Sequence, residues 1–182
     1  SMGLGQIKMD FLIESALRQS EQNNVNFEFG HANIKVIGVG GAGNNMVGWL
    51  YKKGIKGAEI IATNTDHQHL GITGADRKFL IGKDCTRGLG CGGFQTKGAE
   101  AAQESLMQVK EALKGSDMVF VCAGMGGGTG TGASPVVAQV AKDTGAIVIG
   151  TVTMPFNIER ARCDKAEFGL QQLRQVCDTV IV

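Results

Sequence analysis

The stretch MVFVCAGMGGGTGTGASPVVAQVAK, residues 118–142, points to the fold class of this chain. It opens with an apolar run of strand-forming residues, passes through a glycine-rich turn and ends in a segment of helical composition. A strand that is apolar at every position fits burial on both faces, as in a parallel sheet covered by helices. Ligands of such sheets bind at loops that leave the carboxyl ends of the strands, so we expect this turn to be a ligand loop.

The same order of elements recurs along the rest of the chain. Strands are expected at 34–39, 59–64, 78–81, 117–123, 146–152 and 178–182. Helices are expected at 44–53, 97–114, 132–143 and 161–176. Strands that are mostly separated by helices favour right-handed crossovers between parallel strands. The predicted fold class is therefore α/β, with a doubly wound, mostly parallel, Rossmann-like sheet of six strands.

The sequence divides into a leading segment, 1–30, and a main domain, 31–182. The leading segment starts with Ser-Met-Gly, which is typical of a tag remnant, and ends in a polar linker. Between them an extra N-terminal helix is expected over 6–22, because one set of residues recurs at helical spacing. That set is Ile7, Phe11, Leu12, Ser15 and Leu17. Because the chain stops at Val182 within an apolar run, we expect the natural protein to continue beyond it.

Bulk composition narrows the possible partners. The 18 Lys and Arg residues against 17 Asp and Glu give a formal charge of +1, so the basic excess that nucleic-acid or membrane-surface binding needs is lacking. No apolar run approaches the ~18–20 residues of a membrane span, and there is no signal peptide, so direct membrane insertion is not expected. Five cysteines without a C-x-x-C pair fit a reducing cytoplasm.

The first glycine run, GVGGAG at 38–43, satisfies the G-x-G-x-x-G dinucleotide pattern after a strand and before a helix. Alone it indicates a phosphate loop, or a structural tight turn, without deciding the nucleotide. Asp66 follows the second strand, where an NAD-dependent enzyme places the carboxylate that binds ribose. Asn64 and Asp66 are equally well explained as helix caps. His67 and His69 are expected to be exposed loop residues, because no third metal ligand lies near them in sequence.

The second glycine run, 124–132, favours a nucleoside triphosphate over NAD. Successive glycine N–H groups can form an anion-binding concavity, and Thr129 and Thr131 add hydroxyl groups. A dinucleotide does not need two such loops. No G-K-[ST] follows either run, so this is not a Walker-type site. A third glycine-rich segment, 86–93, is placed to close over a γ-phosphate, unless it is a disordered surface excursion.

Five segments taken together resemble the FtsZ family of the tubulin superfamily. They are GVGGAGNN, NTD, TRGLGCGG, GMGGGTGTG and PFNIE, in this order within 34–182. The resemblance implies GTP or GDP as ligand, with Mg²⁺ held through the phosphates and not directly by protein side chains. It also implies a cell-division GTPase that polymerises head to tail into filaments at the cytoplasmic division site. Anchor and regulatory proteins would bind regions outside this chain.

The resemblance also implies the residues that surround the nucleotide. They are Gly40, Gly41, Ala42, Asn45, Asn64, Asp66, Thr86, Gly90, Cys91, Gly92, Gly124, Gly126, Gly127, Gly128, Thr129, Gly130, Pro155, Glu159 and Arg162. No catalytic residue is expected here, because the residues that position water come from a missing loop of the adjacent subunit. The chain alone should therefore be inactive or nearly so.

Two departures from the family pattern stand out. Cys91 occupies a position that is usually Ala in bacterial members, and the stretch after PFNIE is one residue shorter than usual. Arg162 is then the expected nucleotide-contacting arginine, with Arg160 as its competitor. The short stretch and the extra N-terminal helix point to an archaeal FtsZ.

Two other functions remain open from the sequence. An NAD(P)-binding Rossmann oxidoreductase domain would explain Gly38, Gly40, Gly43 and Asp66 but not GGGTGTG. A structural or regulatory superfamily member would bind nucleotide without hydrolysing it.

Overall fold

A computed structural model describes residues 4–23, 32–155 and 160–182. Its centre is a sheet of six parallel strands in the order β3-β2-β1-β4-β5-β6, which confirms the predicted fold class. The strands are β1 Ile34–Val39, β2 Ala58–Asn64, β3 Arg77–Leu80, β4 Met118–Gly124, β5 Ile147–Thr153 and β6 Thr179–Ile181. The order reverses direction at β1, so the crevice between the first and fourth strands is the expected binding position in such a sheet.

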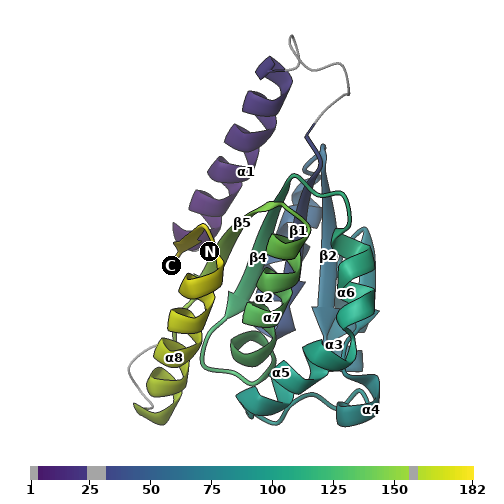
Figure 1. The fold of residues 1–182 in the computed structure, drawn as a ribbon, viewed down its shortest axis with the longest axis vertical. Helices are drawn as coiled ribbons and strands as arrows, with labels where there is room; N and C mark the ends of the chain where they lie inside the picture. Colours follow the sequence, from purple (N-terminus) through teal and green to yellow (C-terminus); the bar gives the residue numbers. More distant parts are fainter. Residues whose placement is uncertain (1–3, 24–31, 156–159) are drawn as a thin grey trace.

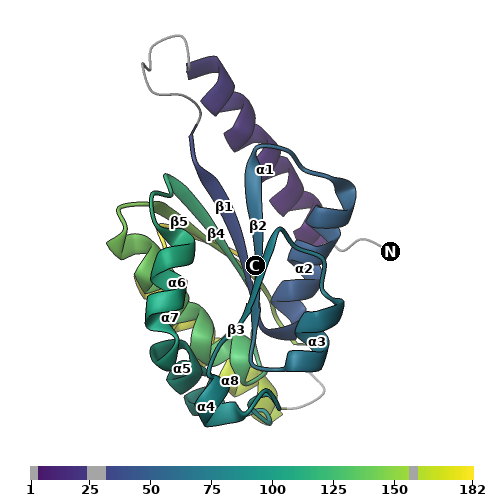
Figure 2. The ribbon, with the colours of Figure 1, turned by 90° about the vertical axis from the view of Figure 1, so that its right-hand side faces the viewer.

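Helices cover both faces of the sheet, which Figure 2 shows from the side. One face carries α1 Leu4–Asn23, α2 Gly40–Lys53 and α3 His67–Ile72. The other carries α5 Gln95–Glu104, α6 Leu106–Leu113, α7 Thr129–Asp143 and α8 Arg160–Val176. The short helix α4 Lys83–Thr86 precedes α5 near the carboxyl ends of the strands.

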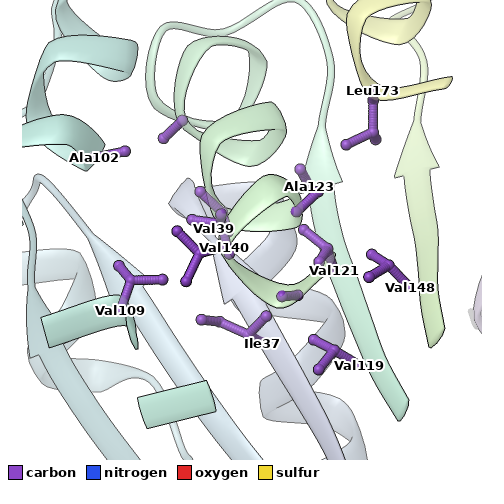
Figure 3. Close-up of a cluster of buried hydrophobic side chains, with 14 of the residues drawn as sticks. Ile37, Val39, Ala102, Val109, Val119, Val121, Ala123, Val140, Val148 and Leu173 are labelled. Atoms are coloured by element: carbon purple, nitrogen blue, oxygen red, sulfur yellow. The ribbon is translucent and has the colours of Figure 1, made fainter. Parts of the chain in front are cut away.

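The central strand β4 shows how the sheet builds two cores. Val119 and Val121 point into the core beneath α5 to α8, part of which is drawn in Figure 3. Phe120 and Cys122 point into the core beneath α1 and α2. Because successive side chains of a strand alternate between faces, a run that is apolar at every position supplies both cores.

The N-terminal helix is present, and its predicted buried face is partly right, because Leu12 and Leu17 pack against the core. Phe11, which we had placed on the apolar face, is 69% exposed, whereas Met9 and Ile13 are fully buried. Met9 packs its sulfur 3.3 Å from the thiol of Cys122 on β4. Asp10 forms an ion pair with Lys53 at the end of α2. Apolar residues occur on more than one side of this helix, so packing against the rest of the fold decided which of them are buried. Figure 1 shows the position of α1 in the fold.

Several predicted boundaries also need correction. Helices α2 and α7 begin at Gly40 and Thr129, earlier than the expected starts at 44 and 132, so parts of both glycine runs form first helical turns. The helix expected over 97–114 is split at Ser105, whose hydroxyl accepts a hydrogen bond from the Gly82 N–H at 2.9 Å. Among the described residues no helix is long and apolar enough to cross a membrane.

Candidate functional site

The carboxyl ends of β1, β4 and β5 surround a cleft of about 530 Å³. It is lined by Val39, Gly41, Ala42, Gly124, Met125, Gly127, Gly128, Thr129, Gly130, Thr153, Met154, Pro155 and Arg162. The two glycine runs are in contact beside it, since a Cβ atom on Gly40 would lie 3.0 Å from the backbone nitrogen of Gly130. The structure thus brings the first two predicted loops to one cavity.

Two helices begin at this cleft without caps. The residues before α2 and α7, Val39 and Gly128, form no side-chain cap hydrogen bond, and neither first turn contains an acidic residue. The first N–H groups of a helix have no partner inside it, and its N-terminus carries about half a positive charge. Two such ends on one cavity make a site for a strongly anionic group, such as a di- or triphosphate.

Arg162 of α8 is the charged side chain among the described residues that line the cleft. Gly126 lets the chain approach it closely, because a Cβ atom there would lie 3.0 Å from the Arg162 side chain and 3.3 Å from Pro155. Arg162 therefore lies at the cleft, where the expected nucleotide-contacting arginine would be needed. Glu159, predicted at the same segment, and the side chain of Arg160 lie outside the described part of the structure.

Asn64 and Asp66 hold the turn after β2. The Asn64 side-chain oxygen accepts hydrogen bonds from the N–H groups of Thr65 at 2.8 Å and Asp66 at 3.1 Å. The Asp66 carboxylate caps α3 by accepting from the His69 N–H at 3.1 Å. The capping role that the sequence left open is therefore present. His67 and His69 lie in the first turn of α3, not in a loop as expected.

The third predicted segment, 86–93, packs against this turn. Asp66 pairs with Leu89 in an isolated antiparallel bridge, and the Gly90 N–H donates to the Thr65 carbonyl at 3.2 Å. Thr86 is buried and donates to the Gly82 carbonyl at 3.0 Å. Gly90 and Gly92 have positive φ angles, 86° and 57°, which glycine adopts without strain. The segment is held in place, which argues against a disordered excursion.

Cys91 of this segment packs against Gly128, one of the residues that line the cleft. Cys91 is buried, and a Cβ atom added to Gly128 would lie 2.8 Å from the Cβ atom of Cys91. Its sulfur lies 3.5 Å from the Thr65 hydroxyl and 3.4 Å from that of Thr129. Thr65 was not predicted from the sequence, because its partners, Cys91 and Thr129, come from two distant loops.

Asn45 is not among the residues that line the cleft. It is exposed on α2 and borders a second hollow of about 480 Å³, together with Trp49, His69 and Thr73. Thr153 and Met154, by contrast, line the cleft but were not predicted. Their position at the carboxyl end of β5 is the signal that would have found them.

Comparison with known proteins decides the family. A model of the GTPase domain of the tubulin/FtsZ family matches residues 33–182. The chain belongs to the tubulin/FtsZ family. The resemblance found in the sequence is confirmed, and the family is not that of the oxidoreductase alternative.

Individual relatives of this tubulin/FtsZ chain are archaeal. It is 55% identical over 172 residues to cell division protein FtsZ 2 of Methanocaldococcus jannaschii, covering 94% of this chain and 45% of that protein. A solved FtsZ dimer from M. jannaschii, empty of ligand, has a TM-score of 0.82 and 47% identity over 89% of this chain and 48% of that one. A GTPγS-bound protofilament of CetZ2 from Haloferax volcanii has a TM-score of 0.73 and 28% identity, over 81% and 48%. The chain spans less than half the length of these relatives.

Proposed function

We propose that this chain is the guanine-nucleotide-binding part of an FtsZ-type GTPase that assembles head to tail into filaments during cell division. The observation that carries the proposal is the convergence of the uncapped N-termini of α2 and α7 on one cleft. The cleft residues supply backbone N–H groups, a threonine hydroxyl and one arginine. Phosphoryl transfer depends mainly on positioning and charge stabilisation, which such groups provide.

Several of the predicted phosphate-side residues fit this role. Gly41, Ala42, Gly127, Gly128 and Gly130 line the cleft, where their backbones can approach an oxyanion. The described residues contain no cluster of three or more His, Cys, Asp or Glu side chains that could hold a metal ion. We infer that Mg²⁺ arrives with the nucleotide phosphates and meets the protein through them.

Self-association follows from the family, because relatives are described as a dimer and as a protofilament. A head-to-tail contact that does not close into a ring gives an open filament. We propose that nucleotide lies between successive subunits, that the neighbour completes hydrolysis, and that the filament acts at the cytoplasmic division site. Anchor and regulatory proteins would bind outside this chain.

Calorimetric titration of the chain with GTP, GDP, ATP and NAD in the presence of Mg²⁺ tests the proposal. We expect binding of GDP and GTP in preference to ATP, and no binding of NAD. Binding of NAD with no response to either guanine nucleotide would refute it. The same samples should release almost no phosphate from GTP, because the neighbouring subunit's loop is needed. Sustained turnover at low protein concentration would contradict that part.

A further inference from the structure

The three loops around the cleft meet in one small cluster of polar side chains. Thr65 follows β2, Cys91 lies in the 86–93 segment, and Thr129 is the first residue of α7. The two threonine hydroxyl oxygens are 2.7 Å apart, and the Cys91 sulfur lies within 3.5 Å of both. Thr65 and Cys91 are buried, whereas Thr129 is partly open to the cleft.

Once the two hydrogen bonds of the Cys91 sulfur are given, counting protons fixes the direction of the third. Each hydroxyl or thiol carries a single proton, so each group can donate once. Thr129 donates to the Cys91 sulfur at 3.4 Å, and Cys91 donates to the Thr65 oxygen at 3.5 Å. The remaining contact must then run from the Thr65 hydroxyl to the Thr129 oxygen, at 2.7 Å. The three groups thus form a closed ring of hydrogen bonds.

The Thr129 hydroxyl donates to the weakest acceptor of this ring, the Cys91 sulfur. A thiol sulfur is a poor hydrogen-bond acceptor, while a phosphate oxygen forms short, charge-assisted bonds. Thr129 lines the cleft, so its hydroxyl can turn from the sulfur to a ligand without losing the hydrogen bond that it accepts from Thr65.

We propose that Thr65 is a positioning residue: it holds the Thr129 hydroxyl ready to donate to a nucleotide phosphate, while Cys91 accepts that proton only until phosphate binds. The inference rests on the proposed function, because it names how one phosphate-binding group of that site is oriented. It also gives a role to the cysteine that replaces the usual alanine at position 91, since alanine offers no hydrogen-bond acceptor there.

A double-mutant cycle on GDP affinity tests the role of Thr65. Valine keeps the shape of threonine but removes the hydroxyl. We expect Thr65→Val to weaken GDP binding about tenfold and Thr65→Ser to restore most of it. In a Thr129→Val background, Thr65→Val should have almost no further effect, because Thr65 acts through Thr129.

Thr63→Val is the matched control. Thr63 lies in β2, two residues before Thr65, and is also fully buried, but its hydroxyl donates to the Gly38 carbonyl at 2.8 Å. This change should lower stability and leave GDP affinity unaltered. Equal weakening of GDP binding by Thr63→Val and Thr65→Val, or additive effects of Thr65→Val and Thr129→Val, would overturn the proposal.

Cys91→Ala gives a second test with the opposite sign, and it does not depend on Thr65→Val folding. The free chain would lose the Thr129–Cys91 bond that phosphate binding breaks anyway, so we expect GDP binding about twofold tighter. Unchanged or weaker binding contradicts the proposal. Failure of the unaltered chain to bind GDP would instead refute the proposed function itself, before any variant is compared.

Discussion

Gly43 and Gly127 belong to the two glycine runs that meet at the cleft, yet their surroundings differ. A Cβ atom on Gly43 would lie 2.1 Å from the carbonyl oxygen of Cys122, so α2 rests directly on the backbone of β4. A Cβ atom on Gly127 would meet no atom within 4 Å. Glycine at 43 is needed for packing between elements, whereas glycine at 127 leaves the cleft open. Glycine therefore serves close packing at some positions of these runs and ligand access at another.

The largest expected effect is that of Gly43→Ala on stability. The added methyl group would meet backbone atoms of β4, which cannot move without separating α2 from the sheet. Overpacking of this kind costs about 3 kcal/mol or more. Urea unfolding followed by circular dichroism should show the loss. Gly71→Ala is the matched control, because a Cβ atom there meets nothing within 4 Å, and it should leave the unfolding midpoint nearly unchanged. Gly54 is less suitable as a control position, because its φ angle of 78° would strain any side chain.

Arg162→Gln tests how much GDP binding at the cleft depends on positive charge and not only on open space. Removing the cation should weaken GDP binding about tenfold and make it less sensitive to salt. Lys114→Gln is the matched control, because Lys114 is an exposed cation at the end of α6, away from the cleft. Calorimetry at two salt concentrations would decide. Equal losses in the two variants would mean that net charge, not the position of Arg162, matters.

The sequence predicted the cleft glycines well because the rule that locates them is local. Ligand loops follow the carboxyl ends of parallel strands, and both runs follow strong apolar strands. In the sequence, Gly43 is explained only as the last glycine of the G-x-G-x-x-G dinucleotide pattern. The physical cause of the need for glycine at 43, the carbonyl of Cys122, lies far away in sequence and appears only in the folded chain.

The same limit explains what was missed elsewhere. Thr65, Cys91 and Thr129 meet from three loops, so no spacing in the sequence joins them. In α1, apolar residues occur at more than one helical phase, and packing on Cys122 selected Met9 over Phe11. Periodicity predicted the helix, but only tertiary contact could choose its buried face.

Gly127→Ala should reverse the result expected at position 43. The new methyl group has free space in the folded chain, and alanine restricts the unfolded chain more than glycine does, so stability should be unchanged or slightly higher. The methyl group would, however, enter the cleft where phosphate oxygens approach the backbone. We expect GDP binding about fivefold weaker, measured by calorimetry. A variant that is less stable but binds GDP normally would show that Gly127 has a packing role after all.

The smallest expected effect concerns the thiol of Cys122, the residue whose backbone lies against Gly43. Burial raises the pKa of Cys122 from 9.0 to about 12. Above pH 9 the unfolded chain loses this proton while the folded chain keeps it, so the free energy of unfolding falls as the pH rises towards 12. At about pH 9.5 the loss should be about 0.8 kcal/mol relative to neutral pH.

Other groups also titrate in this range, so the comparison needs a variant. Cys122→Ala should lower stability at neutral pH through a small cavity, and its stability should then fall less between about pH 8 and 9.5 than that of the parent chain. Parallel pH dependences of the two chains would mean that the Cys122 thiolate reaches water in the folded state. Because Met9 of α1 covers this sulfur, such a result would place the opening at α1 and would leave the contact between Gly43 and β4 intact.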